Sequence, residues 1–134
     1  MSRENVELAR EVFRRFHAGD QTWVEWVDPD IGWDFSAYPL ADLPSSGSGR
    51  ERLRSDVLDI YFSGWLSYEG EIVETVDAGD DIVVIIHEAA RMRGSDAMLE
   101  RDVAHVWTFR EGKWVFWRIL PDREAALESA GLSE

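Results

Sequence analysis

The order of its secondary-structure patterns constrains the fold of this chain most. Its first half carries mainly helical spacing of apolar residues, and its second half carries strand patterns separated by turn-rich segments. We expect strands near residues 68–77, 82–93, 99–110 and 113–120, with Glu111-Gly112 as a tight hairpin turn. Helices that come first and antiparallel strands that follow predict a fold of the α+β class.

The first half of the chain contains three predicted helices and one strand. Apolar residues from Val6 to Phe16 recur at helical spacing and predict an amphipathic helix over residues 3–18. Asp20 is placed to cap a second, short helix, which we expect to end at Asp28-Pro29-Asp30. The other predicted elements are a half-buried strand over 31–36, a loop over 37–49, a helix near 50–63 and a last short helix from Pro121 through Ala126.

Length and charge exclude several classes of protein. A chain of 134 residues fits one domain, which we place at residues 1–134. The formal net charge of −13 argues against binding to nucleic acid or to an anionic membrane. No cysteine is present, and neither a signal peptide nor an apolar run of ~20 residues is apparent. We therefore expect a cytoplasmic protein without disulfides.

Metal and phosphate motifs are not recognisable in the sequence. Asp28, Asp30 and Asp34 lie close together, but their spacing matches no pattern of metal ligands. The segment GSGRERLR has glycines and arginines but not the spacing of a phosphate loop. We expect neither a metal ion nor a cofactor.

Alternation along two predicted strands brings three ionisable residues together. The odd-numbered face of residues 99–110 is the more apolar one, so it should face inward with Arg101 and His105. On residues 82–93 the even-numbered face should turn inward, and Glu88 is its only charge. All three side chains would then project into one apolar interior.

Two interpretations of this trio remain open. An imidazole beside a carboxylate can act as an acid–base pair, with Arg101 holding a developing oxyanion; His105, Glu88 and Arg101 are then catalytic. In the other interpretation Arg101 pairs with Glu88, and His105 bonds a backbone carbonyl in a purely structural network. His17 is explained without a role in catalysis or in this network. It lies at the end of the first predicted helix, where the helix dipole favours a cation.

The last predicted strand is apolar on both faces. Val115, Trp117 and Ile119 form one face, and the other contains Trp114, Phe116 and Arg118. A sheet packed on one side only should alternate apolar and polar residues. We therefore expect the outer face to be covered by a second copy of the chain in a homodimer. Alternatively, the outer aromatic residues are scattered over the surface.

Several segments together resemble a known superfamily. They are VFRRFHAGD, WVDPDIGWDF, GRERLRSDV, AHVWTFREGKWVFWRILPD and REAALESAGL, and they span nearly the whole chain. The chain resembles the SnoaL-like branch of the nuclear transport factor 2-like superfamily, which includes ketosteroid isomerase and limonene epoxide hydrolase. The resemblance implies a strongly bent sheet wrapped round three helices, a pocket in the wide end of the resulting cone, and a dimer formed through the sheet.

The catalytic residues of these relatives are mostly replaced here. The three active-site positions of ketosteroid isomerase correspond to Val12, Phe35 and His105, so its carboxylate base is missing. The catalytic Asp of the SnoaL-type polyketide cyclases and of limonene epoxide hydrolase corresponds to Ile119. His105 matches a His of those cyclases. The resemblance therefore implies the fold and one pocket residue, but no particular reaction.

Three functions are compatible with these patterns. The first is binding of a small apolar molecule without established chemistry, and the second is a cyclase-, isomerase- or hydratase-type enzyme that uses His105. The third is a dimerisation module with a filled core, which would leave no cavity near the ~300 Å³ of the smaller ligand pockets. The residues expected to bind a ligand are Trp33, Phe35, Phe62, Trp65, Trp107, Trp117 and Ile119.

Overall fold

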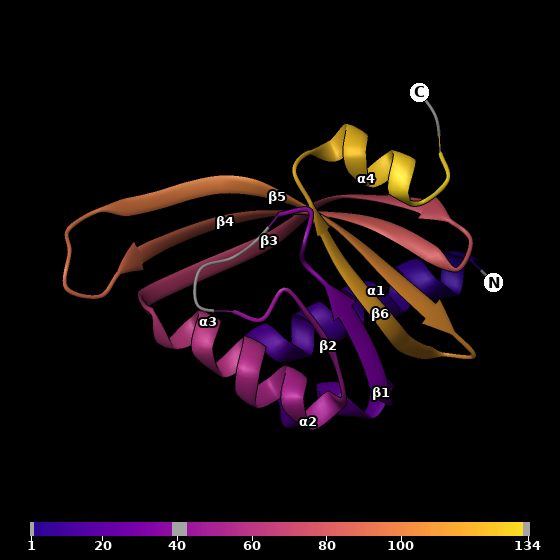
Figure 1. Cartoon of the computed structure of the whole chain (residues 1–134), viewed down its shortest axis with the longest axis horizontal. Coiled ribbons are helices and arrows are strands. Elements are labelled where there is room, and N and C mark those ends of the chain that lie inside the picture. Colours follow the sequence, from indigo (N-terminus) through magenta and orange to yellow (C-terminus); the bar gives the residue numbers. More distant parts are fainter. Residues whose placement is uncertain (1, 39–42, 133–134) are drawn as a thin grey trace.

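A bent sheet of six strands forms the body of the protein, with the strands in the order β2-β1-β6-β5-β4-β3 (Figure 1). The computed structural model describes residues 2–38 and 43–132. Strands β1 and β6 pair in parallel, and every other neighbouring pair is antiparallel. The strands are β1 Val27–Asp34, β2 Ser46–Ser48, β3 Trp65–Ala78, β4 Asp81–Met92, β5 Met98–Arg110 and β6 Lys113–Leu120.

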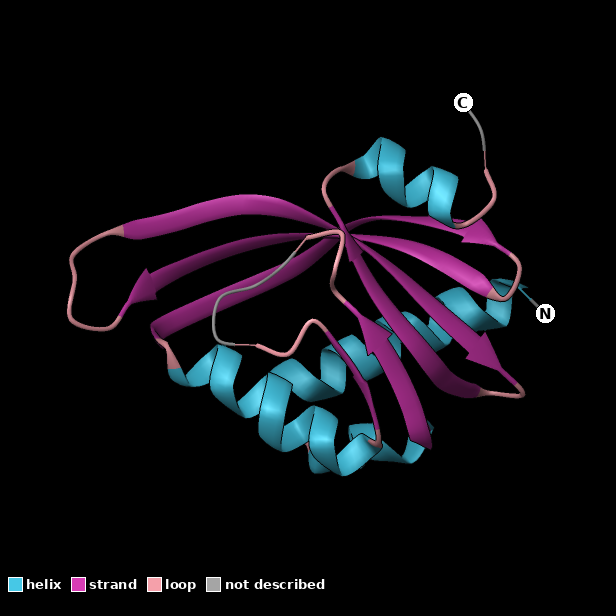
Figure 2. Ribbon diagram, viewed as in Figure 1, coloured by secondary structure: helices cyan, strands magenta, loops and turns pink. Residues whose placement is uncertain are grey.

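Helices cover both faces of this sheet. They are α1 Ser2–His17, the 3₁₀ helix η1 Gln21–Trp26, the continuous run α2 Arg50–Arg52, η2 Leu53–Leu58 and α3 Asp59–Ser63, and α4 Arg123–Ser129. Helix α1 and the run from α2 to α3 lie on the concave side, whereas α4 lies on the opposite side (Figure 2). The expected α+β class is confirmed.

Most predicted elements are found within a few residues of their expected bounds. The side chain of Asp20 caps η1 as predicted, by accepting a hydrogen bond from the backbone N–H of Thr22. The hairpin turn at Glu111 and Gly112 has φ angles of 51° and 79°, as a two-residue turn of this kind requires.

Three boundaries differ from expectation. The segment 28–30 was expected to end a helix, but it belongs to β1 because this strand already begins at Val27. Part of the loop 37–49 forms strand β2, which pairs with β1; residues 39–42 of that loop lie outside the described residues. The last helix begins at Arg123 because the side chain of Asp122 caps it.

The sheet has an apolar core on each face. On the concave side, Ile82, Val84 and Ile86 pack beneath α1 and the run from α2 to α3. On the other side, Val83 and Ile85 pack beneath α4. The chain's own C-terminal helix therefore supplies part of the cover that was expected from a second copy. Self-association through the rest of this outer face stays a prediction.

A bulge in β6 overturns the predicted orientation of Trp114. Phe116 pairs with Thr108, but Trp114 pairs with Phe109, so Val115 is an extra residue between the two pairs. The extra residue turns Trp114 to the concave face, where it is 5% exposed. The expectation that Trp114 lies on the outer face is therefore wrong. Arg118 does lie outside, because it contacts Ser129 in α4.

The glycine of β2 is a tight contact point in this sheet. Gly47 pairs with Trp33, and a Cβ atom at position 47 would lie 2.5 Å from the indole ring of that residue. Trp33 is 1% exposed and has no room to move. We expect Gly47→Ala to lower the free energy of unfolding by about 2 kcal/mol, as overpacking does, in urea denaturation.

A second glycine provides the control for this prediction. A Cβ atom at Gly64 would lie 3.6 Å from its nearest neighbour, the carbonyl oxygen of Tyr61, which is an ordinary contact. Gly64→Ala should therefore leave the free energy of unfolding almost unchanged. Equal effects of the two substitutions would show that the contact with Trp33 is not what constrains position 47.

Candidate functional site

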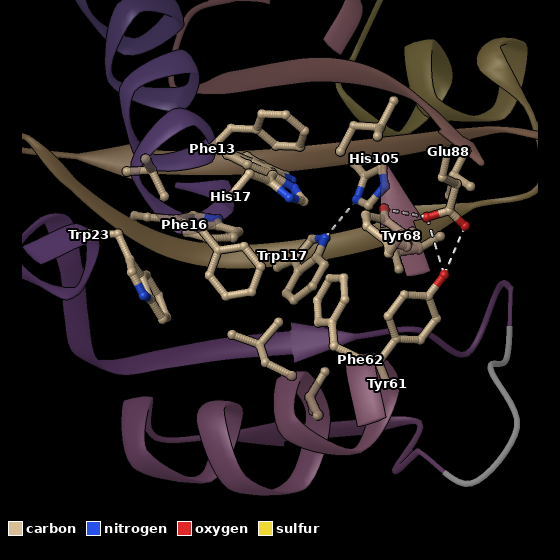
Figure 3. Close-up of a pocket in the computed structure, with 18 of the residues that line it drawn as sticks. Phe13, Phe16, His17, Trp23, Tyr61, Phe62, Tyr68, Glu88, His105 and Trp117 are labelled. Atoms are coloured by element: carbon tan, nitrogen blue, oxygen red, sulfur yellow. Dashed lines mark hydrogen bonds between the residues drawn. The ribbon is translucent and has the colours of Figure 1, made fainter. Parts of the chain in front are cut away.

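A cavity lies between the concave face of the sheet and the helices that cover it (Figure 3). This central cavity has a volume of about 90 Å³. Its wall is formed by α1, η1, the run from η2 to α3, and strands β3 to β6. Most of the wall is aromatic or aliphatic, and the polar groups are contributed mainly by Glu88, Arg101, His105 and tyrosines.

Four of the seven residues that were expected to bind a ligand line the central cavity. They are Phe62, Trp107, Trp117 and Ile119. The other three do not line it. Trp33 and Phe35 are each 1% exposed and are packed as core residues, with Phe35 against Trp117. Trp65 lies at the start of β3, where its ring meets that of Tyr61 edge to face with centroids 5.6 Å apart.

Of the helical residues in this wall, the sequence analysis assigned only Phe62 to the ligand site. Helix α1 places Val12, Phe13, Phe16 and His17 there, on the same amphipathic face that predicted the helix. The other residues that it did not assign to the cavity are Trp23, Leu43, Val57, Leu58, Tyr61, Tyr68, Ile86, Val103 and Trp114. Periodicity marks these residues as buried, but it does not distinguish a cavity wall from a filled core.

Glu88 is the centre of a hydrogen-bonded cluster at one end of the cavity. Its carboxylate is opposite Arg101 on the neighbouring strand, and the Nε of that arginine donates to Oε1 at 2.9 Å. The hydroxyl of Tyr61 donates to Oε1 at 2.8 Å, and that of Tyr68 donates to Oε2 at 2.7 Å. Arg101 also donates to the hydroxyl of Tyr38 at 3.3 Å. All three tyrosines of the chain therefore take part in this Glu88 cluster.

The cluster leaves its carboxylate with little capacity for further chemistry. Glu88 is 5% exposed, and a buried charge needs this number of partners to be tolerated. Burial and the neighbouring carboxylate raise the pKa values of Tyr61 and Tyr68, so both phenols stay protonated and keep donating. The pairing of Arg101 with Glu88 matches the structural interpretation. The cluster nevertheless lines the cavity and does not point away from it.

His105 is bonded to a tryptophan and not to the backbone. The indole Nε1 of Trp117 donates to its Nδ1 at 2.9 Å. An indole N–H can only donate, so Nδ1 must be the acceptor and the ring proton lies on Nε2. Within the described part of the chain no group bonds Nε2, and this atom is not fully shielded from solvent. The expectation that His105 bonds a backbone carbonyl is therefore wrong.

Burial determines the charge of this imidazole. His105 is 7% exposed, and desolvation lowers its pKa from 6.5 to about 4. The ring is therefore neutral at pH 7 and presents an N–H donor to the central cavity. Such a group suits hydrogen bonding to a ligand acceptor better than proton abstraction. The acid–base role of His105 stays a prediction.

His17 is part of the cavity wall as well as of the end of α1. Its ring stacks on Tyr68, with centroids 5.7 Å apart and planes inclined by 6°. Burial against these rings lowers its pKa, so the cation expected at the end of the helix is disfavoured. The aromatic neighbours explain this residue better than the helix dipole does.

Metal ligands and membrane spans were also sought over residues 2–38 and 43–132. In those ranges no group of three or more His, Asp or Glu side chains is arranged to hold a metal ion. Asp28 and Asp34 instead accept hydrogen bonds from the backbone N–H groups of Asp30 and Ser36. Over the same ranges, no helix has the length and apolar character needed to cross a membrane.

Comparison with known proteins identifies the fold. No protein-family model and no curated protein matches the chain. An NTF2-like protein of unknown function from Burkholderia pseudomallei is 18% identical, with a TM-score of 0.74 over 92% of this chain and 95% of that chain. A putative SnoaL-like polyketide cyclase from Jannaschia sp. is also 18% identical, with a TM-score of 0.75 over 96% and 92% of the two chains.

A third solved structure was determined with a small molecule. It is that of TerC co-crystallised with polyporic acid, which is 20% identical, with a TM-score of 0.72 over 95% of this chain and 98% of that chain. At these levels of identity the similarity concerns the fold and not the ligand. With its bent six-stranded sheet around N-terminal helices, this chain has the nuclear transport factor 2-like fold that the sequence resemblance predicted.

Proposed function

We propose that the central cavity binds a small, mostly apolar molecule that carries a hydrogen-bond acceptor, such as a ketone. The observation that carries this proposal is the neutral His105, whose Nε2–H lines an aromatic cavity without a protein partner among the described residues. This N–H is not fully shielded, so a ligand oxygen in the cavity would accept a hydrogen bond from it. Fold neighbours that include a protein co-crystallised with polyporic acid support a small-molecule role.

The volume of the cavity limits the size of this ligand. About 90 Å³ is well below the ~300 Å³ of the smaller ligand pockets, so a steroid-sized molecule does not fit this state. A single small ring is the largest body that we assign to it. By the size criterion stated above, the volume alone does not separate this cavity from the core of a dimerisation module, so the proposal rests on the unpartnered donor of His105.

Binding is favoured over catalysis by the state of the ionisable groups. The carboxylate of Glu88 accepts hydrogen bonds from Tyr61, Tyr68 and Arg101. The Nδ1 of His105 is occupied by Trp117. Neither group is free to take a proton from a ligand, so we place the enzyme hypothesis second.

A matched pair of probes tests the proposal. Cyclopentanone and methylenecyclopentane have nearly the same shape, but only the ketone can accept a hydrogen bond. We expect the ketone to bind about 5-fold more tightly, which corresponds to about 1 kcal/mol for one neutral hydrogen bond. The measurement is a titration followed by NMR of the tryptophan indole N–H signals.

Two variants connect this preference to His105. In His105→Phe/Trp117→Phe the preference for the ketone should shrink, because the variant removes both the Nε2–H and the indole N–H that would otherwise lose its acceptor. His87→Phe is the matched control. His87 lies on the face of the sheet that points away from the cavity, where it is bonded to Asp102 and Glu100. Its loss should leave the preference for the ketone intact. Equal affinities in the unmodified protein, or no binding of either probe, would contradict the proposal.

A further inference from the structure

Trp107, in the wall of the central cavity, carries a second polar group that has no partner among the described residues. The residue is 4% exposed and lines the cavity. Its indole Nε1 is buried and, among the residues described, has no hydrogen-bond partner. Buried donors are nearly always paired in folded proteins, so an orphaned one calls for an explanation.

The neighbouring tryptophans show that the chain satisfies indole donors elsewhere in this wall. Trp114, whose ring stacks on Trp107 with centroids 4.2 Å apart, donates to the carbonyl oxygen of Phe116 at 2.9 Å. Trp117 donates to His105. Of these three tryptophans, Trp107 alone has an N–H without a partner in the described part of the chain.

Trp107 and His105 form a pair of donors. They are two residues apart on β5, so their side chains share the concave face, and their rings meet edge to face with centroids 6.4 Å apart. The acceptors nearby are taken: Glu88 is bonded by three side chains, and Nδ1 of His105 is bonded by Trp117. This part of the wall therefore contains two donors without a partner among the described residues, of which Nε2 of His105 is open to the cavity and Nε1 of Trp107 is shielded.

We infer that Trp107 is a specificity-determining residue whose N–H donates to a second acceptor oxygen of the ligand. This inference rests on the proposed function and narrows the ligand class to small compounds with two neighbouring acceptor oxygens, such as cyclic esters. A neutral ligand is favoured over a carboxylate because Arg101 is already paired with Glu88. Because Nε1 is shielded from solvent, its contact with a ligand oxygen requires the indole to turn toward the cavity when the ligand binds.

A comparison of isosteric probes in the unmodified protein is the first test. γ-Butyrolactone has the ring frame of cyclopentanone with a second oxygen in place of a methylene group. We expect the lactone to bind about 5-fold more tightly than the ketone, as one added hydrogen bond allows. Equal binding of the two probes would overturn the role of Trp107 while leaving the proposed function standing. Binding of neither probe would overturn both.

The second test replaces one group of atoms in Trp107. Benzothienylalanine has the shape of tryptophan but carries sulfur in place of the N–H. At position 107 it should reduce lactone affinity to that of cyclopentanone, leave cyclopentanone affinity unchanged, and raise the Tm of the unliganded protein. A merely structural indole would not change the ratio of the two affinities.

Trp33 provides the matched control. Its Nε1 is also buried without a partner in the described part of the chain, but the residue does not line the central cavity. The same replacement at position 33 should raise the Tm and leave both affinities unchanged. If the lactone-to-ketone ratio falls equally in both variants, or in neither, Trp107 is not the second donor.

Discussion

Replacing Arg101 with methionine should lower the free energy of unfolding by about 3 kcal/mol. The substitution keeps much of the length of the side chain but removes the cation that pairs with Glu88. The side chain of Glu88 is only 7% exposed, so its carboxylate would stay buried without a counter-charge. Removing one partner of a buried ion pair typically costs about 3–5 kcal/mol. The lower end applies here because Tyr61 and Tyr68 still donate to Glu88 and because Arg101 is 28% exposed. Urea denaturation at pH 7 measures the effect.

A double-mutant cycle separates the charge from the packing. In a Glu88→Gln background no carboxylate remains, so Arg101→Met should cost only about 1 kcal/mol. The control is the pair formed by Arg123 and Glu74, whose side chains are 49% and 39% exposed. Arg123→Met should cost less than about 1 kcal/mol, as for other surface ion pairs. Equal losses for Arg101→Met in both backgrounds would mean that its stabilising effect does not depend on the charge of Glu88.

The sequence predicts the elements of this fold well because their patterns are local. Strict alternation on β5 correctly turns Arg101 and His105 to one face, and the apolar face of α1 is recognisable at once. Strand β2 is not recognisable, because its three residues, Ser46–Ser48, carry no apolar pattern and depend on pairing with β1. Short edge strands of this kind are formed by tertiary contacts and not by their own composition.

The site is predicted less completely than the fold because its contacts depend on register. Opposition of Glu88 and Arg101 requires only that the β4–β5 hairpin pairs without a bulge, which it does. In β6, the extra residue Val115 reverses the orientation of Trp114, and no feature of the sequence indicates it. The partner of His105, Trp117, is likewise a neighbour only through the exact pairing of β5 with β6.

The stability of the protein should also depend on pH through His105. Burial lowers the pKa of this imidazole from 6.5 to about 4. Between these two values the unfolded chain binds a proton at His105 that the folded chain does not bind. The free energy of unfolding therefore falls as the pH is lowered through this window, by about 3 kcal/mol in total, since one pKa unit corresponds to about 1.36 kcal/mol.

His105→Phe isolates this contribution. The variant leaves the N–H of Trp117 without its acceptor, which lowers stability by a similar amount at every pH, so the informative quantity is the change with pH and not the offset. The free-energy difference between the unmodified protein and the variant should shrink steadily from pH 7 to pH 4.5. Subtraction removes the contribution of His17, whose pKa burial also lowers, because that residue is present in both proteins.

His87 gives a control of opposite sign. Hydrogen bonds to Asp102 and then Glu100 raise its pKa, so its stabilising effect is present at low pH and is lost as the pH rises through its folded-state pKa. The difference between the unmodified protein and His87→Phe should accordingly grow, by a small amount, as the pH falls. A His105 difference that also grows toward low pH would mean that the imidazole is charged in the folded protein, and a charged imidazole would remove the neutral donor on which ligand recognition in the cavity depends.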